Sequence, residues 1–90
     1  MGHEIERQDN RIVIMQSGWV FVGKYFEKGE DCRLEHASCV RNWGTTKGLG
    51  ELAENGPTPK TVLDKCTTIR FHKLSVVVTL DCAKIWENIL

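Results

Sequence analysis

The chain has 90 residues, enough for one domain with a thin hydrophobic core. Lys and Arg total 12 and Asp and Glu total 12, so the formal net charge is +0. A neutral chain without a basic block lacks the surface that neutralises the phosphates of a double helix. We therefore expect no duplex nucleic-acid partner.

The first residues, Met1 to Asp9, are polar and charged and lack the pattern of a secretory signal. No apolar run approaches the roughly 20 residues that span a bilayer. We therefore expect a cytoplasmic protein without membrane contact. In that compartment Cys32, Cys39, Cys66 and Cys82 are expected to be reduced thiols.

The first elements form a predicted hairpin. We expect residues 1–10 to be a flexible arm and residues 11–90 to be a single β-rich domain. Two runs of β-branched and aromatic residues, Arg11–Gln16 and Trp19–Phe26, flank the turn signal Ser17-Gly18, which predicts two antiparallel strands. Gly23 interrupts the second run, and such a glycine is typical of a bulge, a bend or close approach of another backbone.

A third strand and a short helix follow. The segment Cys32–Ala37 alternates apolar and polar residues, which is typical of a half-exposed strand. Apolar residues within Leu49–Ala53 recur at helical spacing, with Thr46 as the expected N-cap and Asn55-Gly56-Pro57 as a stop signal. This pattern predicts a helix of roughly nine residues, which is stable only when it packs on the rest of the chain.

The last third of the chain contains two more predicted strands. Thr58–Lys65 is expected to be a connecting segment that can run along a sheet edge. The strands are Thr67–His72 and Ser75–Leu80. Asp81 is expected to cap a short C-terminal helix over Cys82–Leu90, whose apolar stripe must pack on this chain or on a neighbouring copy.

The predicted fold class is α+β and β-rich: a small bent antiparallel sheet or a partly open SH3-like or Sm-like barrel. It carries one short inserted helix and a short C-terminal helix. The glycine-bearing second strand and the strand Cys32–Ala37 resemble the strand pair of Sm-like barrels. Both faces of the first two strands are apolar, which indicates a barrel-like wrap or a subunit interface, so we expect a homo-oligomer. The residues expected at the interface are Trp19, Tyr25, Ile85, Trp86 and Ile89.

The segment from Arg41 to Gly50 combines groups that bind anions. The start of a helix has unpaired amides, Arg41 and Lys47 would hold a phosphate, and Trp43 would stack on a base. A glycine within a helix costs about 0.8–1.0 kcal/mol relative to alanine. Gly48 and Gly50 at the helix start therefore need a reason, which is close approach of either a ligand or the sheet. The expected ligand-binding residues are Arg41, Trp43, Thr45, Thr46, Lys47, Gly48 and Gly50.

A purely structural interpretation of the same segment stays open, with Trp43 in the core, Thr46 as a cap and the glycines allowing tight packing. The order of a Walker phosphate loop is absent. Cys32, His36 and Cys39 lack the close spacing of a structural zinc site, and no nucleophile–base or paired-carboxylate spacing is present. We therefore expect no metal, no cofactor and no enzymatic activity.

The run Arg41-Asn42-Trp43-Gly44, followed by Leu49–Gly56, resembles small uncharacterised proteins encoded by bacteriophages and prophages. The resemblance implies a phage accessory protein that acts by binding in the host cytoplasm. The first hypothesis is a small anionic ligand, such as a nucleotide of host defence signalling. The alternative is docking on a host or phage protein complex, which it would inhibit. Single-stranded nucleic acid is a third hypothesis, although few basic residues accompany the aromatic ones.

Overall fold

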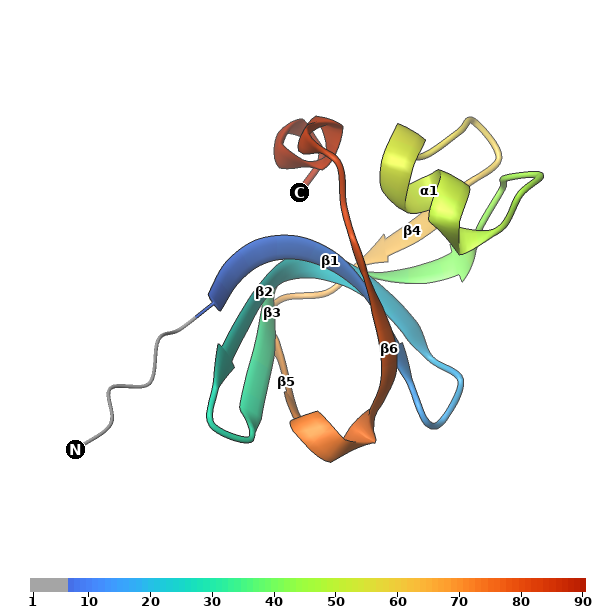
Figure 1. The fold of residues 1–90 in the computed structure, drawn as a ribbon. Coiled ribbons are helices and arrows are strands. Elements are labelled where there is room, and N and C mark those ends of the chain that lie inside the picture. Colours follow the sequence, from blue (N-terminus) through green and yellow to red (C-terminus); the bar gives the residue numbers. More distant parts are fainter. Residues whose placement is uncertain (1–6) are drawn as a thin grey trace.

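In the computed structural model, which describes residues 7–90, six strands form one antiparallel sheet and one α-helix is inserted after the third strand (Figure 1). The strands are β1 (Arg7–Met15), β2 (Val20–Lys28), β3 (Asp31–Asn42), β4 (Val62–Lys65), β5 (Ile69–His72) and β6 (Val76–Asp81). The helix is α1 (Leu49–Asn55), and two 3₁₀ turns are η1 (Lys73–Ser75) and η2 (Lys84–Asn88). The predicted β-rich α+β class is confirmed at this level.

The strand order is β4-β3-β2-β1-β6, and β5 also pairs with β3. One edge of β3 pairs with β2. Along the other edge, the second half of β3 pairs with β4 and the first half of β3 pairs with β5. Figure 1 shows that β1, β2 and β3 bend strongly, with β5, η1 and β6 across the concave side. The sheet therefore has three outer edges, those of β4, β5 and β6.

A β-bulge interrupts the pairing of β2 with β3 at Gly23, where the sequence predicts an irregularity. The register shifts between Val22 and Lys24, where β3 has one residue more than β2. The bulge leaves His36 with a φ of 52°, in the left-handed region. A Cβ atom on Gly23 would lie 3.0 Å from the carbonyl oxygen of Glu35, so the predicted close backbone approach is confirmed.

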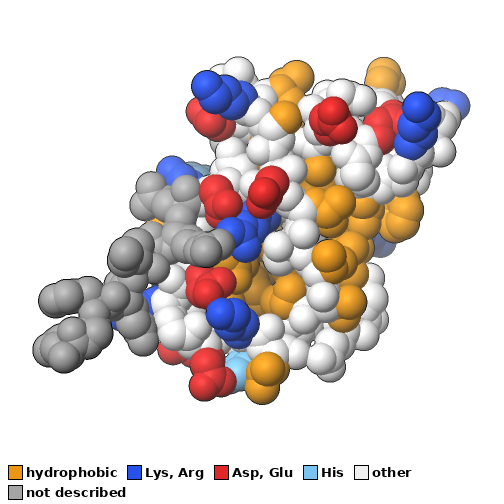
Figure 2. All heavy atoms as spheres, in the orientation of Figure 1, with side chains coloured by type: hydrophobic (Ala, Val, Ile, Leu, Met, Phe, Trp, Pro, Cys, Tyr) orange, Lys and Arg blue, Asp and Glu red, His pale blue; other side chains and the backbone are white. Residues whose placement is uncertain are grey.

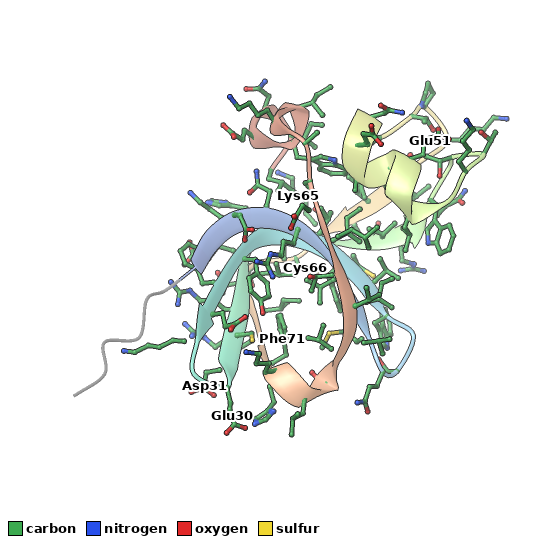
Figure 3. The ribbon with its side chains drawn as sticks, in the orientation of Figure 1. Glu30, Asp31, Glu51, Lys65, Cys66 and Phe71 are labelled. Carbon is green, nitrogen blue, oxygen red and sulfur yellow. The ribbon has the colours of Figure 1, made fainter. Side chains whose placement is uncertain are left out.

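The bent sheet buries apolar side chains on both faces. The concave cluster contains Val13, Tyr25, Cys32, Leu34 and Ala37. Figure 3 shows Phe71 of β5 pointing into the same enclosed space. The convex cluster lies under α1 and the C-terminal segment and contains Ile12, Val20, Val22, Val40, Leu49, Leu52, Ala53 and Trp86. Because this chain covers both faces itself, the apolar first two strands do not require a second copy.

Trp86 joins the C-terminal segment to α1. Its side chain is 0% exposed, and its indole N–H donates to the carbonyl oxygens of Leu52 and Ala53 at 3.0 and 3.1 Å. Ile89 packs beside it against the convex cluster. The apolar stripe at the end of the chain thus docks on this chain, and the segment expected to be a helix contains the 3₁₀ turn η2.

The first strand is longer than the sequence predicts. β1 begins at Arg7, so residues 7–10 of the expected arm belong to the sheet, where they pair with β2. Residues 1–6 of that arm lie outside the described part. The strand extends through polar residues such as Asp9 and Asn10 because their backbones pair with Tyr25 and Lys24 of β2.

The third strand is also longer, and one cap is absent. β3 continues to Asn42 because β4 pairs with it from within the segment Thr58–Lys65, which was expected to be a connection. Asp81 ends β6 and does not cap the last turn, since η2 follows Ala83.

Candidate functional site

The loop between β3 and α1 contains most of the expected ligand-binding residues and is fixed to a turn far away in the sequence. The hydroxyl of Thr61 donates to the carbonyl oxygen of Trp43 at 2.7 Å, and that of Thr58 to the carbonyl oxygen of Gly44 at 2.6 Å. A Cβ atom on Gly44 would overlap the backbone of Thr61. This clamp could not be predicted from the sequence, because the two threonines carry no local signal for it.

The helix start differs from the predicted anion site. α1 has 7 residues, and Gly48 in the N-cap position makes no side-chain capping bond. Thr46 is therefore not the cap: its hydroxyl donates to the Glu51 carboxylate at 3.2 Å, which also accepts the backbone N–H of Lys47 at 3.0 Å. Figure 3 shows Glu51 at this end of α1. The glutamate thus occupies the place that an anion would take at the first turn.

Other donors expected to cradle a phosphate also have partners in this chain. The hydroxyl of Thr45 donates to the carbonyl oxygen of Gly48 at 2.7 Å. Arg41 forms an ion pair of 2.9 Å with Asp64 of β4. A phosphate at the predicted position would therefore compete with two carboxylates that already lie there, Asp64 and Glu51.

Gly48 and Gly50, the two glycines at the helix start, differ in conformation and in surroundings. Gly48 adopts a φ of 82°, which side chains other than glycine rarely adopt, and the ring of Trp43 lies 3.7 Å from the position of its Cβ. Around Gly50, by contrast, a Cβ would meet no atom within 4 Å. Of the two interpretations left open for these glycines, tight packing on the sheet therefore does not apply to Gly50.

Two tryptophans and an arginine remain accessible at this end of the sheet. Trp19 is 55% exposed and Trp43 is 43% exposed. Arg41 lines two hollows, one of about 310 Å³ with Trp19 and one of about 510 Å³ with Trp43 and Lys60. The ring of Trp19 stacks on Phe21 with centroids 6.1 Å apart, which orients it. We call Trp19, Arg41 and Trp43 the Trp–Arg surface.

The residues expected at an interface lie in different surroundings. Trp19 and Ile85 are exposed, and Ile89 is half-buried. Tyr25 is buried in the concave cluster and Trp86 in the convex one. The structure thus corrects the expectation for Tyr25 and Trp86, whose rings cannot reach a partner in this arrangement.

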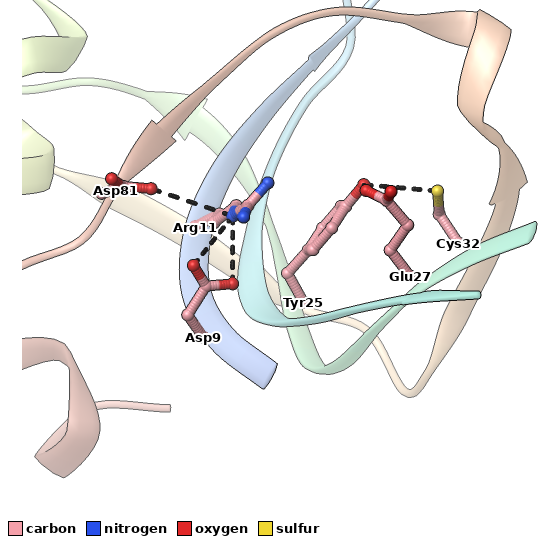
Figure 4. A network of polar contacts seen from close by, with 6 residues as sticks. All are labelled: Asp9, Arg11, Tyr25, Glu27, Cys32 and Asp81. Carbon is pink, nitrogen blue, oxygen red and sulfur yellow. Dashed lines mark hydrogen bonds and ion pairs between the residues drawn. The ribbon is translucent and has the colours of Figure 1, made fainter. Parts of the chain in front are cut away.

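A polar network on the concave side surrounds Tyr25 (Figure 4). The guanidinium of Arg11 lies 4.3 Å from the centre of the Tyr25 ring and pairs with Asp9 at 3.0 Å and Asp81 at 3.8 Å. The Tyr25 hydroxyl donates to Glu27 at 2.9 Å. Burial, followed by the hydrogen bonds of the hydroxyl with Cys32 and with Glu27, raises the pKa of the phenol. The phenol therefore stays protonated, and in the described residues every buried side-chain nitrogen or oxygen has a partner.

The four cysteines are free thiols, and Cys32 and Cys39 are buried. Burial raises the pKa of Cys39, and burial with the nearby carboxylates raises the pKa of Cys82 to about 12. Both thiols are thus protonated near neutral pH, which makes them poor nucleophiles. Within residues 9–90, no group of three or more His, Cys, Asp or Glu side chains is placed to hold a metal ion. No helix in the described part is long and apolar enough to cross a membrane.

Comparisons of the chain with protein-family models, with curated proteins and with solved structures found no match. No relative therefore assigns a role to the Trp–Arg surface, and its geometry and charges are what bear on the function.

Proposed function

We propose that the chain is a non-catalytic docking module that binds another protein through the Trp–Arg surface. The observation that carries this proposal is the clamped loop, which holds Trp43 half-exposed while Gly44 is fixed against the turn at Thr58 and Thr61. A large side chain that is already ordered loses little entropy on binding. Tryptophan and arginine are also the residue types that dominate binding energy at protein interfaces.

The charges around Trp43 indicate the chemistry of the partner. Lys47 and Lys60 are exposed, and in the described part of the chain their side-chain ammonium groups form no ion pair. Arg41 lines the same hollow as Lys60, and its guanidinium is held by Asp64. A partner segment that carries an apolar side chain next to an aspartate or glutamate would fill the hollow at Trp43 and pair with these cations.

A second candidate is the small anionic ligand, such as a nucleotide. It is favoured by the hollow of about 510 Å³ in which Trp43 and Lys60 lie together, because an aromatic ring and a cation bind a base and a phosphate. It ranks second because Glu51 and Asp64 occupy the positions where the phosphate was expected. Binding would require lysines alone to offset two nearby carboxylates.

We also propose that the bent sheet is a partly open barrel of the SH3-like type. In support, β1, β2 and β3 follow one another as antiparallel neighbours, and a 3₁₀ turn connects β5 to β6. β6 then returns to pair with β1. Small barrels of this kind often bind through loops at one end, and the Trp–Arg surface lies at such an end. If the phage resemblance of Arg41–Gly56 holds, the partner belongs to the bacterial cytoplasm.

The test is capture of a partner by the immobilised chain from bacterial lysate, followed by affinity measurement with the purified partner. We expect Trp43→Ala and Arg41→Ala each to weaken binding by roughly tenfold or more, as hot-spot residues do. The matched control is Ile85→Ala, which removes an exposed apolar side chain on η2 without touching the surface. Circular dichroism verifies that each variant is folded.

Equal affinity of the wild type and both surface variants would reject the docking proposal. Calorimetry against a panel of nucleotides tests the second candidate with the same proteins. Binding of a nucleotide that is lost in Lys60→Ala and retained in Ile85→Ala would establish the small-ligand function instead.

A further inference from the structure

The outer edges of the sheet, those of β4, β5 and β6, differ in their protection against other strands. β4 and β5 have only 4 residues each, and Asp64 and Lys65 of β4 and Arg70 of β5 are exposed and charged. Short length and charge are the usual means by which an edge strand avoids pairing with another chain. β6 has 6 residues with a bulge at Val77, and residues 74–80 contain no charged side chain. The β6 edge is thus the least protected of the three.

The outer edge of β6 has free backbone groups. The N–H of Cys82 donates to the carbonyl oxygen of Asn10 at 3.0 Å, so this pair faces inward. Because antiparallel pairs alternate, the N–H and C=O groups of Thr79 and Asp81 point away from β1. Just beyond β6, the N–H of Ala83 donates to the carbonyl oxygen of Ala53 in α1 at 2.9 Å, so α1 lies at the end of this edge. Within Val76–Asp81, no backbone hydrogen bond in the described residues reaches the outer edge, because β5 pairs with β3 instead.

Apolar side chains accompany this open edge. Leu74 is 73% exposed, Val77 is 63% exposed and Val78 is 45% exposed. Figure 2 shows hydrophobic side chains gathered in a band on the face that carries β6. A strand that pairs with β6 would cover these side chains as well as the free backbone groups. Both apolar burial and backbone hydrogen bonds would therefore favour pairing.

We propose that β6 pairs with β6 of a second copy of this chain in an antiparallel, two-fold arrangement. With Thr79 opposite Thr79 of the copy, the outward-pointing backbone groups of both strands meet. Asp81, the one charged residue in 74–81, then lies opposite Val77, so no like charges face each other. The formal net charge of +0 also leaves no long-range repulsion between copies.

The proposal places self-association on a surface other than the residues expected from the sequence. Tyr25 and Trp86 are buried, and the apolar tail docks on its own chain. It is also independent of the docking function, because the β6 edge shares no residue with the Trp–Arg surface. The failure of one proposal therefore leaves the other standing.

The experiment compares Val77→Lys on β6 with Val62→Lys on β4. Both valines are exposed on edge strands, so each lysine reaches solvent without opening the core. Light scattering gives the mass from micromolar to millimolar protein. We expect the wild type and Val62→Lys to rise from one chain toward two, and Val77→Lys to stay at one chain throughout.

Amide exchange measured by NMR locates the contact. We expect the amides of Thr79 and Asp81 to become protected as the wild-type concentration rises, and to stay unprotected in Val77→Lys. A wild type that remains a single chain at millimolar concentration overturns the proposal, as does a dimer that survives Val77→Lys or is abolished equally by Val62→Lys. Protection of β6 that appears only when a foreign extended peptide is added also rejects the second copy as the occupant.

Discussion

Gly44 lies so close to Thr61 that one added methyl group would overlap the backbone of Thr61. The φ of Gly44 is also 69°, in the region that favours glycine. Neither constraint can be relieved by turning a side chain, because the neighbouring atoms belong to the backbone. The position of the loop that carries Trp43 therefore depends on this one glycine.

Replacing Gly44 with alanine should lower the free energy of unfolding by more than about 1 kcal/mol, because the new methyl group forces the loop off its turn. Urea denaturation followed by circular dichroism measures this change. The amide of Thr61, which donates to Thr58 at 3.0 Å, should also exchange faster. Unchanged exchange at Thr61 would show that the loop absorbs the methyl group elsewhere.

Replacing Gly50 with alanine should have the opposite effect. Gly50 lies inside α1, and a Cβ there meets no atom within 4 Å. Alanine should therefore raise the free energy of unfolding by about 0.5–1 kcal/mol, since it loses less backbone freedom on folding. The same urea experiment gives the value. A loss of stability would mean that this face of α1 contacts something in solution.

Replacing Trp86 with phenylalanine should cost about 1–3 kcal/mol, because it removes a buried donor and leaves space in the convex cluster. Trp43→Phe is the control and should change stability by less than about 0.5 kcal/mol, since its ring is half-exposed. The fluorescence of Trp86→Phe should move to longer wavelength, because only the more exposed tryptophans remain. An unchanged spectrum would contradict the burial of Trp86.

The thiol of Cys82 should make the fold less stable at high pH. Burial, followed by the charges of Asp81 and Asp9, raises its pKa to about 12. The unfolded chain loses this proton at lower pH than the folded one, so the contribution is complete below the unfolded pKa. It is lost as the pH rises toward the folded value. Urea midpoints measured at increasing alkaline pH should fall more steeply in the wild type than in Cys82→Ala.

Replacing His36 with glycine should stabilise the chain by up to about 1 kcal/mol. The left-handed conformation costs a residue with a side chain about 1–2 kcal/mol. Glycine avoids this cost, but part of the gain is offset because glycine loses more backbone entropy on folding. His36 is exposed, so little packing is lost. Thermal unfolding compared with His36→Ala, which removes the ring but keeps a side chain in the left-handed conformation, provides the measurement. A lower midpoint for His36→Gly would indicate that its ring makes a contact that stabilises the bulge.

Elements with local signals could be predicted from the sequence. The hairpin around Ser17-Gly18 is confirmed by the pairing of β1 with β2, and the close approach at Gly23 is confirmed as well. The stop signal Asn55-Gly56-Pro57 correctly ends α1 after Asn55. Each of these features depends on the conformational preference of a few neighbouring residues, so a short window of sequence contains the necessary information.

Features that depend on distant partners could not be predicted. β3 continues to Asn42 only because β4 pairs with it, and β4 has no strong strand pattern of its own. The alternation of the apolar strands shows two apolar faces but not what covers them. The apolar stripe of the C-terminal segment does not show where it docks either, so the sequence alone places Trp86 at an interface. In the site, Glu51 accepts two hydrogen bonds from the loop, which the helical spacing of the apolar residues around it does not reveal.

The apolar residues on both faces of β1 and β2 have a consequence for strand alignment. A slip of one residue normally moves apolar side chains into solvent, but here it would exchange one apolar face for another and cost little. Gly23 prevents this slip, since Glu35 and Ala37 approach it so closely that neither Val22 nor Lys24 would fit in its place. The smallest residue of the strand therefore sets how the hairpin aligns with β3, and a larger residue there would allow misaligned chains to accumulate during folding.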